Sequence, residues 1–270
     1  MRRKRARLWS AVLVLCIVAL IGALLHYLSF MPRYNVQTIA VEGASRTSSG
    51  EIEERARSQI KSSSNALFSS SNIFLYGPSR IREALLAHFP TIKTVRVGRP
   101  SLFSTTVYVR VEEREPYALW CLSAEAGSPE PGCYDIDRDG FIFARAGISR
   151  TAAHVFTGGV AATSSTPIGS RFAPGHFEGL LAFLDLLSEE GFTPEGARVE
   201  NSQDFIVQLK DSYYLKVSFG EDMRDLLQNL QLILSSDALK DAHEKIQYID
   251  LRFGDRVYYK LKSDTKNSAL

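Results

Sequence analysis

A long apolar run near the N-terminus is the feature that most constrains this chain. Residues 8–30 contain no Asp, Glu, Lys or Arg. At about 1.5 Å per residue, a helix of this length crosses a hydrocarbon core of about 30 Å. The residues that precede the run include five basic ones: Arg2, Arg3, Lys4, Arg5 and Arg7. We therefore expect a cytoplasmic basic tail at 1–7, a transmembrane helix at 8–30, and everything after Pro32 outside the membrane.

A cleaved secretory signal is the alternative interpretation of this run. Such a signal has an apolar region of about 7–15 residues and ends in small residues at its cleavage site. Here the run is longer, and the segment from His26 to Pro32 contains bulky residues. The pattern therefore favours an uncleaved anchor, and both interpretations leave the rest of the chain outside.

Composition and charge favour folded domains over a nucleic-acid-binding surface. Hydrophobic residues make up 45% and charged residues 23% of the chain, as in ordinary globular proteins. Of the 32 Lys and Arg, removing the five before the anchor leaves 27 against 30 Asp and Glu, about −3 in net charge. This balance argues against nucleic acid as a partner. About 238 residues follow Pro32, enough for two modest domains.

Two of the three cysteines lie in the exported part. Cys121 and Cys133 flank a segment rich in Gly and Pro that reads as a loop between strands, whereas Cys16 lies in the anchor. A disulfide is favoured outside the cytoplasm and would close a short loop. Two free thiols remain open as an alternative. A zinc pair would need two further ligands, and none lies near in the sequence.

Residues 34–115 predict a small β-α-α-β-β unit. Strand alternation at 36–41, 92–97 and 105–111 surrounds two helical stripes. The stripes consist of Ile52, Ala56 and Ile60, and of Ile81, Leu85, Leu86 and Phe89. This order packs two helices on one face of a three-stranded sheet.

Residues 116–262 predict a mixed-sheet unit with two amphipathic helices. Short strand patterns recur at 117–121, 133–136, 141–143, 155–160, 197–200, 205–209, 213–219, 246–253 and 256–261. The helical stripes contain Phe177, Leu180, Leu181, Leu184 and Leu187, and Met223, Leu226, Leu227, Leu230, Ile233 and Leu234. The fold class is therefore α+β after a single-pass anchor, with a disordered polar tail at 263–270.

Ordered sequence segments resemble the FtsQ/DivIB family of bacterial cell-division proteins. In the first unit these segments lie at residues 39–43, 72–74, 81–85, 90–95 and 107–116, and they are similar to a POTRA domain. In the second unit they lie at 115–120, 139–143, 215–221 and 248–260, and they are similar to the family's β-domain. The short cytoplasmic tail, the Ser-rich connector around 62–71 and the cysteine pair depart from the family pattern.

The resemblance implies a bitopic scaffold at the division septum of the cytoplasmic membrane. Its expected partners are small bitopic coiled-coil proteins like FtsB, FtsL or DivIC, which add a strand to the last edge of the β-domain. The edge residues that match are Arg252, Phe253, Arg256, Val257, Tyr258, Tyr259 and Lys260. An extended partner can pair with an unpaired strand edge, and tyrosines suit an interface. Tyr258 and Tyr259 could equally be ordinary strand residues that pack on the sheet.

No motif predicts an enzyme, a cofactor or a small-molecule substrate. The run from Asp135 to Gly140 opens like a calcium-binding loop, but its twelfth position is Ala146 instead of the required Glu. The histidines are scattered and form no metalloprotease pair. Two other classes stay open. A membrane-anchored envelope enzyme would need a ligand-lined cleft, and a POTRA-type translocation component would need many lipid-facing strands.

Overall fold

The computed structural model describes residues 2–62, 68–122, 132–147, 152, 154–160, 166–210 and 213–262. The chain divides into two compact units, Met1–Arg114 (unit 1) and Glu115–Leu270 (unit 2). The tail predicted to be disordered at 263–270 lies outside the described residues. The architecture confirms an α+β protein with one N-terminal apolar helix and a mixed-sheet unit.

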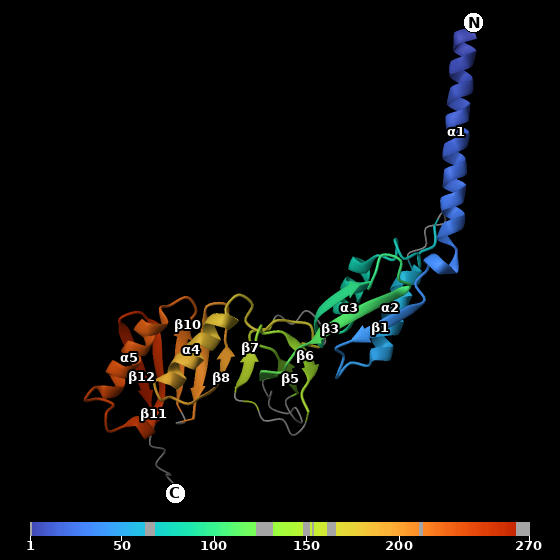
Figure 1. Ribbon diagram of the computed structural model, residues 1–270. Coiled ribbons are helices and arrows are strands. Elements are labelled where there is room, and N and C mark those ends of the chain that lie inside the picture. The colour runs from blue at the N-terminus through green and yellow to red at the C-terminus, as the bar shows by residue number, and fades with distance from the viewer. Residues whose placement is uncertain are drawn as a thin grey trace. The chain divides into compact units, whose positions relative to one another are not determined.

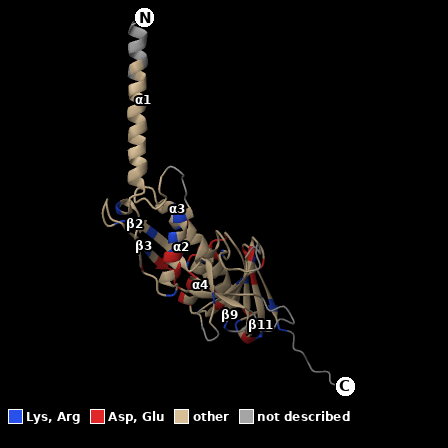
Figure 2. Cartoon of the chain, turned by 90° about the vertical axis from the view of Figure 1, so that its right-hand side faces the viewer, with Lys and Arg blue, Asp and Glu red and all other residues tan. Residues whose placement is uncertain are grey.

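The apolar run forms the helix α1, Arg2–Ser29. Within it, the 19 residues of Ala11–Ser29 are apolar enough to cross a membrane, and those before Ser29 are not buried against the rest of the protein. The helix carries no charged side chain over this stretch (Figure 2). Because an α-helix pairs its own backbone groups, it can enter lipid without leaving polar groups unsatisfied. These properties agree with a single-pass anchor.

Unit 1 continues with a short 3-10 helix and a three-stranded sheet covered by two helices (Figure 1). Its elements are η1 Pro32–Tyr34, β1 Thr38–Glu42, α2 Ser49–Ser62, α3 Pro78–His88, β2 Ile92–Gly98 and β3 Thr106–Glu113. The sheet order is β1-β3-β2, with β1 parallel and β2 antiparallel to β3. Val107, Val109 and Val111 point to the same face of β3, and all three are buried against the apolar stripes of the helices.

Glu113, at the end of β3, holds the loop that enters α2. Its carboxylate accepts hydrogen bonds from Ser45 Oγ at 2.7 Å, the Arg46 amide at 2.9 Å and the Thr47 amide at 2.8 Å. Burial alone would raise the pKa of Glu113, but these hydrogen bonds outweigh it and lower the pKa from 4.5 to about 2. The ionised carboxylate therefore stabilises the folded state.

The described strands of unit 2 form a nine-stranded mixed sheet. Its strands are β4 Ala118–Cys121, β5 Cys133–Ile136, β6 Ile142–Arg145, β7 Val155–Gly158, β8 Pro194–Val199, β9 Asp204–Leu209, β10 Tyr214–Ser218, β11 Ile246–Phe253 and β12 Arg256–Leu261. The order is β12-β11-β10-β9-β8-β7-β4-β5-β6. Three neighbouring pairs are parallel, β4 with β7, β7 with β8, and β10 with β11, while the other five are antiparallel. Among the described strands, β12 and β6 are therefore the two edges.

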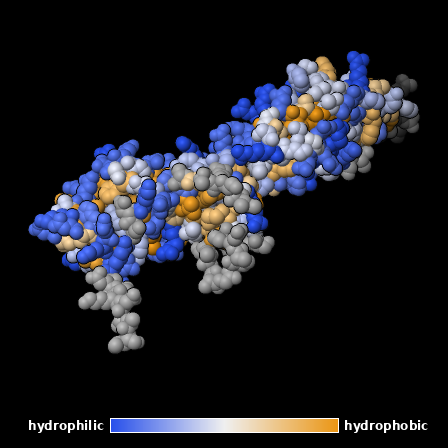
Figure 3. Space-filling model, turned by 90° about the horizontal axis from the view of Figure 1, so that it is seen from below, coloured by the Kyte–Doolittle hydropathy of each residue, from blue (hydrophilic) through white to orange (hydrophobic). Residues whose placement is uncertain are grey.

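Two helices pack on the sheet of unit 2 (Figure 1). They are α4 Phe177–Glu189 and α5 Met223–Ser235, and a 3-10 turn, η2 His243–Lys245, leads into β11. Their stripes meet the buried strand residues Val207, Leu215 and Ile249 in one core. The polar residues of the helices face outward, and the view in Figure 3 is mainly hydrophilic over the described parts of both units.

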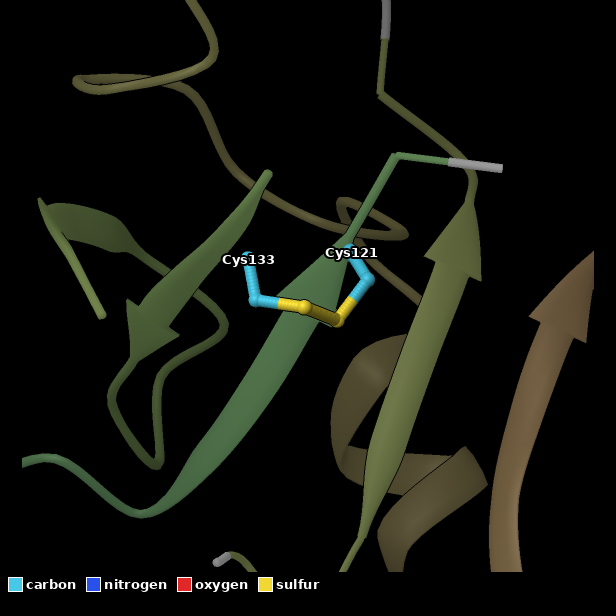
Figure 4. The surroundings of a disulfide bond; sticks show 2 residues. All are labelled: Cys121 and Cys133. Carbon is cyan, nitrogen blue, oxygen red and sulfur yellow. A yellow bond between two sulfur atoms is a disulfide. The ribbon is translucent and has the colours of Figure 1, made fainter. Parts of the chain in front are cut away.

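A disulfide joins two neighbouring strands of unit 2. Cys121 on β4 and Cys133 on β5 are register partners, and their sulfur atoms are bonded at 2.05 Å (Figure 4). The two cysteines are 12 positions apart in the sequence, and residues 123–131 between them lie outside the described part. The sequence left both a disulfide and two free thiols open, and the structure contains the disulfide.

Replacing Glu113 should make the free energy of unfolding depend less on pH in the acid range. Because the pKa of Glu113 is lower in the folded state, its stabilisation is complete above about pH 4.5 and is lost between pH 4.5 and 2. We expect Glu113→Gln to lower the free energy of unfolding at pH 7 by about 1–2 kcal/mol and to weaken this dependence. Urea unfolding of the full chain in detergent between pH 2 and 7 measures both effects. Glu112→Gln, on the exposed face of the same strand, is the control and should change stability by under about 0.5 kcal/mol.

Opening the disulfide should destabilise unit 2. On the chain-entropy model, a closed loop of this length contributes about 3 kcal/mol, since the unfolded chain loses freedom. We expect the double variant Cys121→Ser/Cys133→Ser to unfold at lower urea concentration than the oxidised wild type. Reduced wild type should match the double variant. Equal midpoints for oxidised and reduced protein would contradict the expectation.

Candidate functional site

The edge strand β12 is the candidate interaction site. Within the described residues, β12 is hydrogen-bonded to β11 on one side and has no strand on the other. A two-residue turn, Gly254-Asp255, connects the two strands, and the Asn229 side chain donates to the Gly254 carbonyl at 3.1 Å. The free side of β12 presents a row of backbone N–H and C=O groups that an extended segment can pair with.

The direction of each backbone amide in β12 follows from a hydrogen bond at its end. The Lys262 amide donates to the Lys245 carbonyl at 2.7 Å, so it points toward the β11 side. Amide directions alternate along a strand. The amides of Tyr258 and Lys260 therefore point toward β11, and those of Val257, Tyr259 and Leu261 point to the free edge.

The side chains of β12 divide between the two faces of the sheet. Val257 packs against the core on the helix side, and Tyr259 and Leu261 share that direction by alternation. Arg256, Tyr258 and Lys260 point to the opposite face. Tyr258 is 51% exposed and Tyr259 is 40% exposed, so neither ring is fully used in packing within the chain.

Phe253, next to the turn, contacts Tyr258 on the edge strand. Phe253 lies at the end of β11 and is 54% exposed. Its ring meets that of Tyr258 edge-on, with centroids 5.1 Å apart. The two rings form one exposed apolar surface at the hairpin. Exposed aromatic pairs of this kind can anchor a partner.

Arg252 differs from the other basic residues of the predicted set, because its guanidinium is held by carboxylates of its own chain. Its Nε and Nη2 donate to the two carboxylate oxygens of Asp250 at 2.8 and 2.7 Å, and its Nη1 donates to Asp204 at 3.0 Å. The hydrogen bonds with Asp250 raise the pKa of Arg252. Arg252 therefore ties β11 to β9, whereas Arg256 and Lys260 are exposed.

The carboxylate of Asp204 completes this cluster. Burial would raise its pKa, but hydrogen bonds from Ser218 Oγ at 2.8 Å and from Arg252 lower it. Asp250 is only 5% exposed, so its charge depends on Arg252 for compensation. The cluster thus holds β9, β10 and β11 together beside the edge strand.

Sequence reasoning missed a neighbouring aromatic pair. Tyr214 on β10 stacks on its register partner Tyr248 on β11, with centroids 5.4 Å apart. The Lys216 ammonium lies 4.5 Å from the centroid of the Tyr248 ring. Tyr248 in turn is the register partner of Lys260 on β12. This aromatic and basic strip therefore shares the sheet face of Tyr258. In the sequence, only the strand alternation within residues 246–253 bears on which face Tyr248 occupies, and it does not indicate that Tyr214 is its neighbour.

The calcium-like run forms the turn between β5 and β6. Asp137 Oδ1 accepts hydrogen bonds from the amides of Asp139 and Phe141, both at 2.9 Å. Gly140 has φ of +76°, a conformation that L side chains rarely adopt. These contacts describe a tight turn, and Phe141 starts the next hydrogen-bonded segment.

A hollow with a volume of about 690 Å³ lies on unit 2. Its polar lining consists of Thr157, Glu195, Arg198, Gln208 and Tyr214. Among the described residues, no group of three His, Cys, Asp or Glu is placed to hold a metal ion. Within the described part of the chain, this lining includes one carboxylate, Glu195, and no Ser, Cys or His.

No protein-family model matches this sequence, and a search of curated proteins finds no match.

Replacing Arg252 should destabilise the fold much more than replacing Arg256, although both arginines lie near the edge. We expect Arg252→Ala to lower the free energy of unfolding by about 2–3 kcal/mol, because it leaves the buried Asp250 charge without its partner. Arg256→Ala is the matched control and should cost less than about 0.5 kcal/mol. Urea unfolding of both variants at neutral pH measures the difference. Similar midpoints for the two would show that the ion-pair cluster contributes little.

Proposed function

We propose that this protein is a bitopic scaffold of the bacterial divisome, of the FtsQ/DivIB type. In this proposal the N-terminus lies in the cytoplasm, α1 crosses the cytoplasmic membrane, unit 1 is a POTRA domain and unit 2 is the β-domain. The protein recruits small coiled-coil membrane partners like FtsB and FtsL to the septum and links them to septal wall synthesis. It acts by binding and not as an enzyme.

The open edge of β12 is the observation that carries this proposal. It combines free backbone groups with exposed aromatic rings at Phe253, Tyr258 and Tyr259. A partner segment that added a strand would gain main-chain hydrogen bonds, and its alternate side chains would meet the two faces of the edge. Arg256 and Lys260 are exposed cations on one face, which suits an acidic partner segment.

The rest of the chain supports the same assignment. A single helix suited to a membrane comes first among the described elements, followed by the β-α-α-β-β order in unit 1. The sequence segments that resemble the family occur in the same order along both units. An anchored protein with an open edge beyond the membrane is suited to holding other membrane proteins at one place.

Proline substitutions should separate edge pairing from side-chain contact. Tyr259→Pro removes an N–H that points to the free edge, which an edge strand tolerates. We expect it to reduce capture of a small bitopic coiled-coil protein by at least about tenfold while the fold is kept, because strand addition loses a main-chain bond. Affinity capture from solubilised host envelopes with the tagged full chain, followed by mass spectrometry, measures this. Tyr259→Ala keeps the N–H and is the control for loss of the ring.

Hydrogen exchange gives an independent reading of the same prediction. Binding should newly protect the amides of Val257, Tyr259 and Leu261, whereas those of Tyr258 and Lys260 are already paired with β11. Tyr258→Pro should instead weaken the β11–β12 pairing and lower stability. Capture that survives Tyr259→Pro unchanged would place the partner elsewhere, and capture of no bitopic protein would contradict the scaffold role.

A further inference from the structure

Unit 1 carries an exposed apolar patch that its core does not use. The patch consists of Phe74, Leu75, Leu102 and Phe103, called the Phe74 patch below. Phe74 is 52% exposed and Phe103 is 68% exposed. The two rings meet edge-on with centroids 6.2 Å apart, although they come from different loops, one before α3 and one between β2 and β3. A cluster of exposed large apolar side chains usually marks an interaction surface.

The Phe74 patch adjoins the last turn of α1. A hollow of about 360 Å³ is lined by Leu25 and Leu28 of α1 together with Phe74 and Leu75. Leu25 belongs to the stretch Ala11–Ser29 that is suited to a membrane, and it precedes Ser29 by about one helical turn, roughly 6 Å. Phe74 and Leu75 therefore lie beside the C-terminal end of the stretch that is suited to a membrane, and Phe103 is linked to this end through its ring contact with Phe74.

Hydrogen bonds fix this position. The Ser69 amide donates to Ser29 Oγ at 2.9 Å, and the Asn72 side chain donates to the Ser29 carbonyl at 3.4 Å. In addition, the Ile73 amide donates to the Tyr34 carbonyl at 2.8 Å. Ser29 and Asn72 are both buried. The loop that carries Phe74 is thus attached to the end of the helix through buried polar contacts.

The chemistry of the patch matches a membrane interface. Aromatic side chains concentrate at the level of lipid headgroups. The Arg99 guanidinium lies 5.4 Å from the Phe74 ring centroid and 5.7 Å from that of Tyr76, and it donates to the Leu102 carbonyl at 2.6 Å. A cation beside apolar groups can meet lipid phosphate while the rings reach toward the acyl chains.

We propose that the Phe74 patch inserts into the headgroup region of the same bilayer that α1 crosses, at the C-terminal end of the helix. Lipid is the favoured occupant because the patch is continuous with the apolar surface of α1 itself. This second contact would hold unit 1 against the membrane instead of leaving it free on its anchor. The inference requires α1 to span a membrane, and it does not depend on strand addition at β12.

Quenching of a fluorophore by lipid tests this contact directly. The full chain with Cys16→Ser and Phe103→Cys, kept oxidised so that Cys121 and Cys133 stay bonded, offers one thiol for an environment-sensitive label. The labelled protein is reconstituted in phosphatidylcholine–phosphatidylglycerol vesicles that contain a lipid with a nitroxide near its headgroup. We expect the nitroxide lipid to quench the label at 103 at least threefold.

A label at the other end of the same hairpin is the matched control. Glu112 is exposed and lies six residues after Thr106 on β3, about 20 Å farther along the strand. With Glu112→Cys in the same background, the nitroxide lipid should quench the label little, and an aqueous quencher should reach it. Adding Phe74→Ser to the Phe103→Cys protein should reduce lipid quenching if the patch, and not the label, makes the contact.

Three outcomes would overturn the inference. Equal lipid quenching at positions 103 and 112 would show no preferred depth. Quenching at 103 that Phe74→Ser leaves unchanged would attribute the contact to the label. Protection of the label at 103 from both the lipid and the aqueous quencher would mean that a protein segment, such as a second copy of this chain, covers the patch.

Discussion

Backbone hydrogen bonding is the constraint on which the arrangement of this protein depends. In α1 every central amide pairs within the helix, so the segment Ala11–Ser29 can lie in lipid. In unit 2 the same groups pair between strands, and an open sheet necessarily leaves two edges. The protein thus combines a segment that needs no partner with an edge that can accept one. The proposed scaffold role uses both properties.

The charged side chains likewise fall into two groups: some are hydrogen-bonded within the chain, and others are exposed. Glu113 and Asp204 accept several hydrogen bonds within the chain, which lower their pKa values and make their ionised forms part of the fold. Arg252 belongs to this group because two carboxylates hold it. Arg256 and Lys260 on β12 are exposed and remain available to a partner. Neighbouring cations in one hairpin therefore have different roles.

Local patterns in the sequence predicted the elements but not their neighbours. The valines of β3 alternate, and the leucines of α4 and α5 recur at helical spacing, because those periods reflect one buried face. Pairing between strands depends on contacts far apart in the chain. Nothing local indicates that β1 lies beside β3 or that β7 lies between β4 and β8. For the same reason, the stacking of Tyr214 on Tyr248 was not predicted.

By itself, the sequence determined the apolar helix, the α+β class and the order of elements, since hydrophobic periodicity and length follow from the residues alone. The tertiary structure decided which side chains bond within the chain and which remain exposed. It joined Cys121 to Cys133, held Arg252 in an ion-pair cluster and left Tyr258 and Tyr259 on an open edge. It also brought Phe74 into contact with Phe103 and placed Phe74 beside the end of α1. These outcomes depend on distances between residues that are remote in sequence, which periodicity does not encode.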